Sequence, residues 1–282
     1  MLMSHFTAMG GALLSKPWRA LPENNKEVLD FLEEYQPRNK DVQHIRILLH
    51  GPAAAAKSSF INSVESSLLN RVTSRALTDS ISARSFSKRY KTFKIQKNPQ
   101  GLYSFVFNDI MGFDHGNSGV CVEDVKLVMK GHITENYKFN PQSQLKENDP
   151  NYKSSPTLED RVHVLVCVYP ASSVSIMPKD ILRQMREVRL AASDMGIPQL
   201  AIITKVDEAC PAAGKNINNV YKSKYLKEKV DEFHMALGIP HNRIFLVKNY
   251  SKEMETEAGI DALILYALEQ MIHAGEDFLN SL

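Results

Sequence analysis

The chain has 282 residues, of which 34 are Lys or Arg and 32 are Asp or Glu, so its formal net charge is +2. This balance argues against general nucleic-acid binding, which needs a concentrated basic face. With 43% hydrophobic and 23% charged residues, the composition excludes a disordered or collagen-like chain and predicts one large or two small globular domains.

The cysteines and the apolar runs indicate the cellular location and whether the chain spans a membrane. Cys121, Cys167 and Cys210 show no Cys-x-x-Cys spacing, so we expect neither a disulfide framework nor a zinc site. Reduced thiols favour a cytoplasmic location. The first residues have neither a basic start nor a cleavage site, and we expect no secretory signal. No apolar run reaches the roughly 20 residues of a membrane-spanning helix, so we expect no membrane span.

Hydrophobic patterning divides the chain into residues 1–40, a flexible leader followed by a helical extension, and residues 41–282, one α/β domain. Apolar runs predict strands at 44–50, 90–95, 103–108, 162–169, 199–204 and 243–247. Helical spacing occurs at 25–35, 57–69, 120–130, 179–195, 219–237 and 259–273. Residues 71–88 have the composition of a mobile loop, and residues 131–160 that of a long insertion. Strands alternate with helices and the central strands are apolar throughout, which predicts a three-layer α/β sandwich with a mostly parallel sheet.

The first motif is a loop between a predicted strand and a predicted helix, where Gly51, Lys57 and Ser58 have the spacing Gly-x5-Lys-Ser. In a phosphate-binding loop (P-loop), backbone N–H groups surround the phosphates, the lysine reaches the β- and γ-phosphates, and the hydroxyl holds Mg²⁺. Ser59 follows in the same helix start, and Ala56 stands where glycine is usual. The alternative is a helix N-terminus with an incidental lysine, but the strand–loop–helix context favours the P-loop.

Two further motifs follow predicted strands. Asp109 and Gly112 form Asp-x-x-Gly, in which the carboxylate can hold Mg²⁺ through water and the glycine N–H can donate to a γ-phosphate. Thr204, Lys205 and Asp207 form Thr-Lys-x-Asp, in which the carboxylate can accept two hydrogen bonds from guanine while the lysine stem covers the base. The alternative for Asp207 is a helix-capping aspartate. Ser58 and Asp109 are therefore the expected Mg²⁺ ligands.

These motifs, in this order and each at a strand end, resemble the G domain of the GTPase superfamily, a P-loop NTPase fold. Lys248–Ser251, after the last predicted strand, is either a loop that contacts the base or a plain turn. The chain also resembles the interferon-induced protein 44-like family, in the stretches KPW, RILLHGP, KSSFINSV, SFSKRYKTFKI, NDIMGF, VEDVKLVMKGHI and ITKVDEACP. This resemblance implies a cytosolic, interferon-inducible, GTP-binding protein of innate antiviral defence. It assigns the nucleotide site to Gly51, Lys57, Ser58, Asp109, Gly112, Thr204, Lys205 and Asp207.

Two departures from these patterns bear on activity. Ala54 and Ala56 stand where family members carry glycine, and an alanine at positive φ costs roughly 1 kcal/mol or more, so we expect weak nucleotide binding. Four successive alanines also fit a loop altered to disable binding. Phe113 follows Asp-x-x-Gly in place of a water-orienting glutamine, and the nearby His115 fits a solvated surface group better than a base, so we expect at most a slow GTPase.

The sequence thus predicts GTP or GDP with Mg²⁺ as ligands and leaves Thr73 and Thr78 open as the mobile-loop Mg²⁺ ligand. We expect guanine nucleotide as one partner and, as another, a protein of antiviral signalling or a second copy of the chain. The alternative function is that of a nucleotide-free pseudo-GTPase, which serves as a protein-interaction scaffold.

Overall fold

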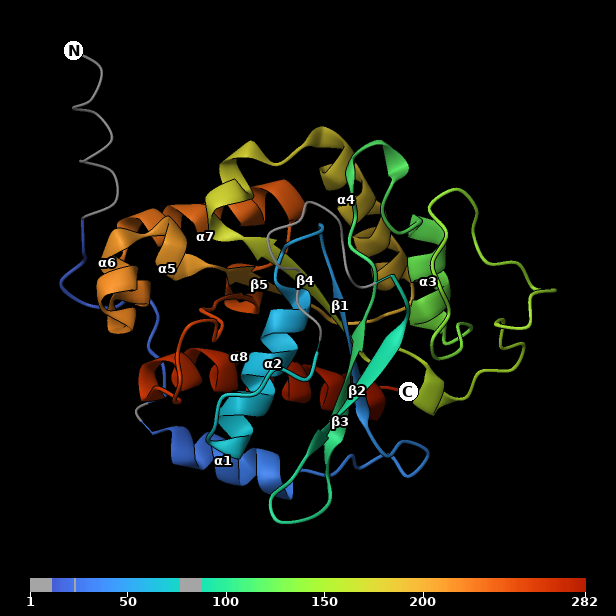
Figure 1. Cartoon of the computed structure of the whole chain (residues 1–282), viewed down its shortest axis with the longest axis horizontal. Coiled ribbons are helices and arrows are strands. Elements are labelled where there is room, and N and C mark those ends of the chain that lie inside the picture. Colours follow the sequence, from blue (N-terminus) through green and yellow to red (C-terminus); the bar gives the residue numbers. More distant parts are fainter. Residues whose placement is uncertain (1–11, 23, 77–87) are drawn as a thin grey trace.

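Within residues 12–22, 24–76 and 88–282, the part of the chain that this computed structural model describes, six strands form one sheet in the order β2-β3-β1-β4-β5-β6 (Figure 1). The strands are β1 (Ile45–His50), β2 (Lys91–Gln96), β3 (Leu102–Asp109), β4 (Val164–Pro170), β5 (Gln199–Thr204) and β6 (Ile244–Leu246). β2 runs antiparallel to β3, and the other neighbouring strands are parallel. The central strands β1, β4 and β5 are buried except for one half-buried residue in each, because both faces of the sheet are covered.

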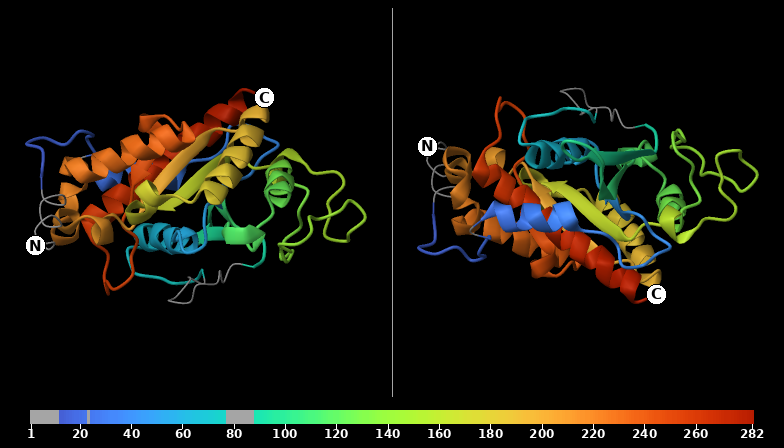
Figure 2. Two further views of the ribbon diagram at one scale, coloured as in Figure 1. Left: turned by 90° about the horizontal axis from the view of Figure 1, so that it is seen from above. Right: turned by 90° about the horizontal axis from the view of Figure 1, so that it is seen from below.

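Helices cover both faces of this sheet (Figure 2). The α-helices are α1 (Asn25–Glu34), α2 (Lys57–Leu69), α3 (Val122–Lys130), α4 (Lys179–Asp194), α5 (Val206–Ala209), α6 (Pro211–Lys215), α7 (Lys224–Leu237) and α8 (Ala258–Asn280). The 3₁₀ turns are η1 (His115–Asn117), η2 (Leu158–Asp160), η3 (Ala171–Ile176), η4 (Ile217–Lys222) and η5 (His241–Arg243). α2 and α8 pack together on one face with α1 against α8, whereas α3, α4 and α7 pack in a row on the other. The predicted three-layer α/β sandwich is confirmed.

One predicted helix is wrong. Residues 219–237 have a continuous helical pattern, but the chain forms η4 and α7 with a break at Ser223. The Ser223 hydroxyl accepts a hydrogen bond from the Leu226 N–H at 3.2 Å, so this serine caps a new helix. Its backbone also pairs with Leu13, which keeps it out of either helix.

The expected flexible leader is also wrong for the part that is described. The Leu14 N–H donates to the Lys222 carbonyl at 2.8 Å, and the Trp18 N–H donates to the Tyr221 carbonyl at 2.9 Å. The Trp18 ring meets the Tyr221 ring edge-on at 4.9 Å. Residues 12–18 are therefore fixed to η4. The division of the chain at residue 40 stays a prediction.

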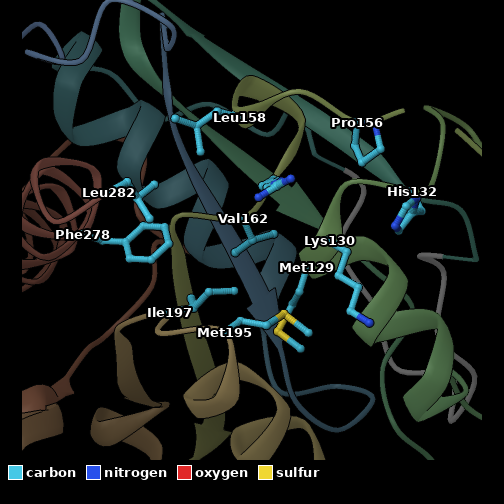
Figure 3. Close-up of a pocket in the computed structure, with 11 residues that line it drawn as sticks. Met129, Lys130, His132, Pro156, Leu158, Val162, Met195, Ile197, Phe278 and Leu282 are labelled. Carbon is cyan, nitrogen blue, oxygen red and sulfur yellow. The ribbon is translucent and has the colours of Figure 1, made fainter. Parts of the chain in front are cut away.

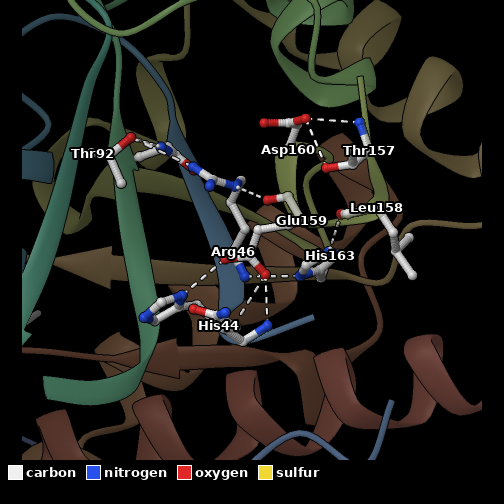
Figure 4. A network of polar contacts seen from close by, with 10 residues as sticks. His44, Arg46, Thr92, Thr157, Leu158, Glu159, Asp160 and His163 are labelled. Carbon is white, nitrogen blue, oxygen red and sulfur yellow. Dashed lines mark hydrogen bonds and ion pairs between the residues drawn. The ribbon is translucent and has the colours of Figure 1, made fainter. Parts of the chain in front are cut away.

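Residues 131–160 extend past α3 at one side of the molecule (Figures 1 and 2). The final turn of this segment is tied to the start of β1 by a polar network (Figure 4). Glu159 accepts from the His44 Nδ1 at 2.8 Å, and the Arg46 Nε donates to the Glu159 carbonyl at 2.9 Å. His163 accepts from the Arg46 N–H at 2.9 Å, and its Nε2 lies 2.9 Å from the Leu158 carbonyl. Burial lowers the pKa of His163 to about 4, so the imidazole is neutral in this network.

None of the helices in the described ranges has the length and apolar character of a membrane-spanning segment.

Candidate functional site

Three of the predicted motifs lie at the same edge of the sheet. Leu49 is in register with Asp109, His50 with Cys167, and Pro170 with Thr204, so β1, β3, β4 and β5 end side by side. Parallel strands place their carboxyl ends at one edge, and open α/β sheets bind ligands there. The loop after β1, the Asp-x-x-Gly segment after β3 and the Thr-Lys-x-Asp segment after β5 therefore face one region.

The loop after β1 has the backbone conformation of a glycine-rich loop. Gly51 has φ 146°, and a Cβ at this position would lie 2.1 Å from the Val168 carbonyl oxygen, so the position requires glycine. Ala54 and Ala56 have φ 59° and 69°, in the left-handed region that alanine rarely adopts. Both alanines occupy positions where the chain geometry favours glycine, as the motif spacing predicts.

Lys57 begins α2 and turns back over the loop. Its ammonium donates to the Pro52 carbonyl at 3.0 Å and to the Gly51 carbonyl at 3.4 Å. Ahead of it, the helix N-terminus presents backbone N–H groups without a side-chain cap, a geometry suited to an anion. Burial, and then the charge of Lys57, lower the pKa of His50 to about 3. The His50 imidazole is thus neutral beside the positive charge of Lys57.

Ser58 and Asp109, the predicted Mg²⁺ ligands, are in direct contact. The Ser58 hydroxyl donates to the Asp109 Oδ2 at 2.6 Å, and both side chains are buried. A hydroxyl and a carboxylate are hard oxygen donors of the kind that Mg²⁺ prefers, and Mg²⁺ keeps several waters or phosphate oxygens in addition. The described residues contain no group of three or more His, Cys, Asp or Glu side chains that could hold a metal without such help. Ser59, half-buried, lies in the same first turn of α2.

The Asp-x-x-Gly segment packs directly on the loop. A Cβ on Gly112 would lie 2.5 Å from the Ala53 backbone nitrogen, so only glycine allows this approach. The Phe113 N–H donates to the Gly51 carbonyl at 3.0 Å, and the Ala53 N–H donates to the Phe113 carbonyl at 2.9 Å. These two bonds join the first half of the loop to residue 113. No sequence pattern indicates this pairing, because it is made by backbone atoms.

The side chains after Gly112 do not form a water-activating site. The Phe113 ring is buried, 6.0 Å from the His50 ring. Asp114 accepts hydrogen bonds from the His115 N–H at 2.8 Å and the Ser118 hydroxyl at 3.0 Å. His115 is exposed and its Nδ1 lies 3.2 Å from Asp180. This arrangement agrees with the expectation that His115 is a surface group.

The Thr-Lys-x-Asp segment contacts the same loop from the other side. The Thr204 hydroxyl donates to the Ala55 carbonyl at 2.9 Å, which fixes the end of β5 to the loop. Lys205 has φ 57° and precedes α5, in which Asp207 is half-buried. Burial alone would lower the pKa of Lys248, but its ion pair with Glu253 and the nearby charge of Asp207 raise the pKa above its usual value. The structure thus brings Lys248 close to the predicted guanine-reading carboxylate.

Asn249 is a candidate that the sequence points to only as part of a turn. Its Nδ2 donates to the Ala56 carbonyl at 3.4 Å, and its Oδ1 is buried with no hydrogen-bond partner within the described residues. The Tyr250 N–H is bonded to the Ser63 hydroxyl at 2.9 Å, so this N–H is not available to a base. The buried acceptor on Asn249 therefore fits a donor on a ligand seated at the loop.

Of the two threonines considered for Mg²⁺, the structure describes one. The Thr73 hydroxyl donates to Glu65 at 3.1 Å, and its N–H donates to the Ser66 hydroxyl at 2.9 Å. Glu65 is seven residues beyond Ser58, which is about 10 Å along α2. Thr73 therefore lies far from the Ser58–Asp109 pair in this conformation. Thr78 lies outside the described residues.

The strand order, with β2 alone antiparallel, and the P-loop, Asp-x-x-Gly and Thr-Lys-x-Asp segments at one edge define a P-loop α/β protein of the G-domain type. No protein-family model matches the chain.

The resemblance to the interferon-induced protein 44 and 44-like proteins is confirmed by curated relatives. Interferon-induced protein 44 of Pan troglodytes and that of Homo sapiens are each 34% identical over 261 residues, 92% of this chain and 59% of the relative. Interferon-induced protein 44-like of Homo sapiens is 33% identical over 263 residues, 92% of this chain and 58% of the relative. The chain thus spans less than two thirds of the length of these relatives.

Two solved structures are similar at low identity. Toc33 from Arabidopsis thaliana, in complex with GDP and Mg²⁺, aligns with a TM-score of 0.47 and 12% identity, over 93% of this chain and 94% of that chain. A probable GTP-binding protein engB aligns with a TM-score of 0.40 and 11% identity, over 84% of this chain and 99% of that chain. The assignment of the fold rests on the strand order instead.

Proposed function

We propose that the protein binds guanine nucleotide with Mg²⁺ at the carboxyl edge of its sheet. The observation that carries this proposal is the convergence of three motifs far apart in the chain. Asp109 bonds to Ser58 at 2.6 Å, and Thr204 bonds to the loop at 2.9 Å. A chance match in sequence has no reason to bring these side chains into contact.

Each residue has a role in this proposal. Lys57 neutralises phosphate charge, and the N–H groups at the start of α2 surround the phosphates. Ser58 and Asp109 hold Mg²⁺, which supplies charge neutralisation at the phosphates when bound. Asp207 accepts two hydrogen bonds from guanine, and the Lys205 stem covers the base.

The pairing of Phe113 with the loop favours a diphosphate over a triphosphate. Gly112 is expected to meet a γ-phosphate, but it is buried against the Ala53 backbone, and the Phe113–Gly51 and Ala53–Phe113 hydrogen bonds hold it there. A third phosphate at Gly112 must separate these segments and break two hydrogen bonds, each worth about 1 kcal/mol. We therefore infer that GDP binds about tenfold or more tightly than GTP and that hydrolysis is slow.

The biological setting is proposed from the relatives. These relatives are named interferon-induced proteins. The resemblance supports an interferon-inducible protein of innate antiviral defence that acts in the cytoplasm through a protein partner or self-association. Because the chain spans about three fifths of those relatives, these roles are proposals for this chain.

Calorimetric titration tests the nucleotide proposal. We expect heat with GDP and Mg²⁺, weaker binding of a non-hydrolysable GTP analogue, and none with ADP. Asp207→Ala should weaken GDP binding about 100-fold, because two hydrogen bonds to a charged group are lost. The neighbouring exposed carboxylate gives the matched control, Glu208→Ala, which should bind GDP like the parent. Equal binding of GDP and ADP, or no heat at millimolar nucleotide, contradicts the proposal.

The second candidate, a nucleotide-free scaffold, is favoured by one set of contacts. Groups that would contact a nucleotide in this loop already bond to other protein atoms. The Lys57 ammonium donates to the Gly51 and Pro52 carbonyls, and the Ala53 N–H donates to the Phe113 carbonyl. A melting temperature that rises with GDP but not with ADP excludes this candidate, since only a bound ligand stabilises the fold in this way.

A further inference from the structure

A second cavity, of about 380 Å³, lies at the opposite edge of the sheet from the P-loop. It is bounded by the residues that lead into β4 and β5 and by the C-terminal ends of α3, α4 and α8. Its lining residues are Met129, Lys130, His132, Pro156, Leu158, Arg161, Val162, Met195, Ile197, Phe278 and Leu282. Small-molecule sites in proteins run from about 300 to 1,000 Å³ and are mostly apolar. This cavity is at the small end of that range, which suits a single alkyl chain.

The wall of the cavity is apolar and adaptable. Figure 3 shows Met129, Val162 and Ile197 in the middle of the view, with Phe278 at one side and Lys130 at the other. Val162 and Ile197 are buried, while Met195 and Phe278 are half-buried. Methionine side chains are flexible and polarizable, and they fit irregular apolar ligands.

No Asp or Glu side chain is among the residues that line the cavity, whereas Lys130 and Arg161 are. Lys130 and Arg161 are exposed, and in the described ranges neither side chain has a carboxylate at ion-pair distance. The two acids that precede Arg161 in the chain are already engaged. Glu159 bonds to His44 at 2.8 Å (Figure 4), and Asp160 pairs with Lys153 at 2.6 Å.

At two of the helix C-termini that border the cavity, those of α3 and α4, carbonyl groups are already hydrogen-bonded. Carbonyl oxygens at helix ends repel an anion only where they are left unbonded. At the end of α3 the Val128 and Met129 carbonyls accept from Gly131 and Val162. At the end of α4 the Ala192 carbonyl accepts from Ile197. Within the described ranges, Lys130 and Arg161 therefore stand without a carboxylate partner beside an apolar cavity, and the carbonyl groups named at the ends of α3 and α4 are already bonded.

From this combination we propose that the cavity binds a single-chain aliphatic monocarboxylate, a fatty acid of medium length. The alkyl chain lies between Met129, Met195 and Phe278, and the carboxylate meets Lys130 and Arg161. Neither the P-loop nor any nucleotide takes part in this site, so the proposal does not depend on the nucleotide-binding function.

Methyl NMR of the protein with ¹³C-labelled methionine tests the proposal directly, with dodecanoate as the probe below its micelle-forming concentration. The Met129 and Met195 methyl signals should shift and saturate, whereas those of Met235 and Met254, which are 79% and 90% exposed, should not move. Each methylene removed from the probe should weaken binding about fourfold, from roughly 0.8 kcal/mol per buried CH₂. Dodecanol, which has the same chain without the charge, should bind several-fold more weakly.

Variants test separately the contributions of the two cationic side chains and of the apolar cavity to binding. The double change Lys130→Gln with Arg161→Gln should weaken dodecanoate binding about tenfold and leave dodecanol binding unchanged. Lys126→Gln is the control and should change neither affinity, because Lys126 is on the same helix as Lys130 but is paired with Glu123 and lies outside the cavity. Met195→Trp should fill the cavity and abolish binding of both probes. The melting temperature of each variant verifies that it is folded. No Met129 or Met195 shift, equal affinity for dodecanoate and dodecanol, or full binding by a folded Met195→Trp protein overturns the proposal.

Discussion

Replacing Ala54 and Ala56 by glycine should stabilise the fold. Both alanines are left-handed, with φ 59° and 69°, and this conformation costs an L-residue about 1–2 kcal/mol. Glycine removes that cost but loses about 0.4–1 kcal/mol more entropy on folding. The net gain is therefore about 0.5–1 kcal/mol at each position. For the pair this predicts a rise of about 2–8 °C in melting temperature in a domain of this size.

Thermal unfolding followed by circular dichroism measures this change, and the same loop supplies the control. Ala55 is buried and is not among the residues with positive φ, so Ala55→Gly should lower the melting temperature. The reasoning is refuted if the Ala54→Gly/Ala56→Gly protein melts at or below the temperature of the parent.

This prediction also bears on nucleotide affinity. The sequence suggested that alanines at positive φ weaken binding through backbone strain. Both alanines hold these conformations in the folded chain, so their strain opposes folding. The melting temperature of the glycine variant reports this strain, and its GDP affinity reports in addition the removal of the two methyl groups.

Three further predictions follow from single contacts. Gly112→Ala should cost about 2–3 kcal/mol in urea denaturation, because its Cβ would lie 2.5 Å from the Ala53 nitrogen; unchanged stability would contradict the close packing of the two segments. The pKa of His163 is about 4 in the folded protein and 6.5 ordinarily, so on acidification the unfolded chain is protonated before the folded one. The free energy of unfolding should therefore fall by up to about 3 kcal/mol as the pH drops from 6.5 to 4. Urea denaturation at several pH values measures that slope, and His163→Gln should reduce it. Thr204→Val should cost about 1–2 kcal/mol, because the buried Ala55 carbonyl loses its donor; a melting temperature equal to the parent's would count against that bond.

Much of the fold follows from local signals in the sequence. Continuous apolar runs such as 199–204 mark buried parallel strands, and β5 has these bounds. The break at Ser223 was missed because the apolar spacing on both sides has the same period. What divides the two helices is the serine cap together with the pairing of Ser223 to Leu13, more than 200 residues earlier. Such a contact leaves no mark in a local window.

In the candidate site, too, some features follow from local sequence signals and others depend on contacts between distant segments. Lys57, Asp109 and Thr204 were predictable because each motif stands at the end of an apolar strand, and parallel strands bring their ends together. The pairing of Phe113 with Gly51 was not predictable, since backbone atoms make it and any residue type could do so. The position of Asn249 was likewise not predictable. The turn after β6 brings its side chain against Ala56 of the P-loop and buries its Oδ1 acceptor.

The Phe113 contacts connect two properties of the proposed site. The side chain was expected to slow hydrolysis because phenylalanine cannot orient water. The structure adds that the backbone of residue 113 closes the loop, so a glutamine at this position would keep the same hydrogen bonds at 3.0 and 2.9 Å. Under the proposed function, triphosphate entry and water activation both require residues 112–113 to move away from residues 51–53. The free energy of that single movement, more than the identity of side chain 113, then sets the preference for GDP and the rate of hydrolysis.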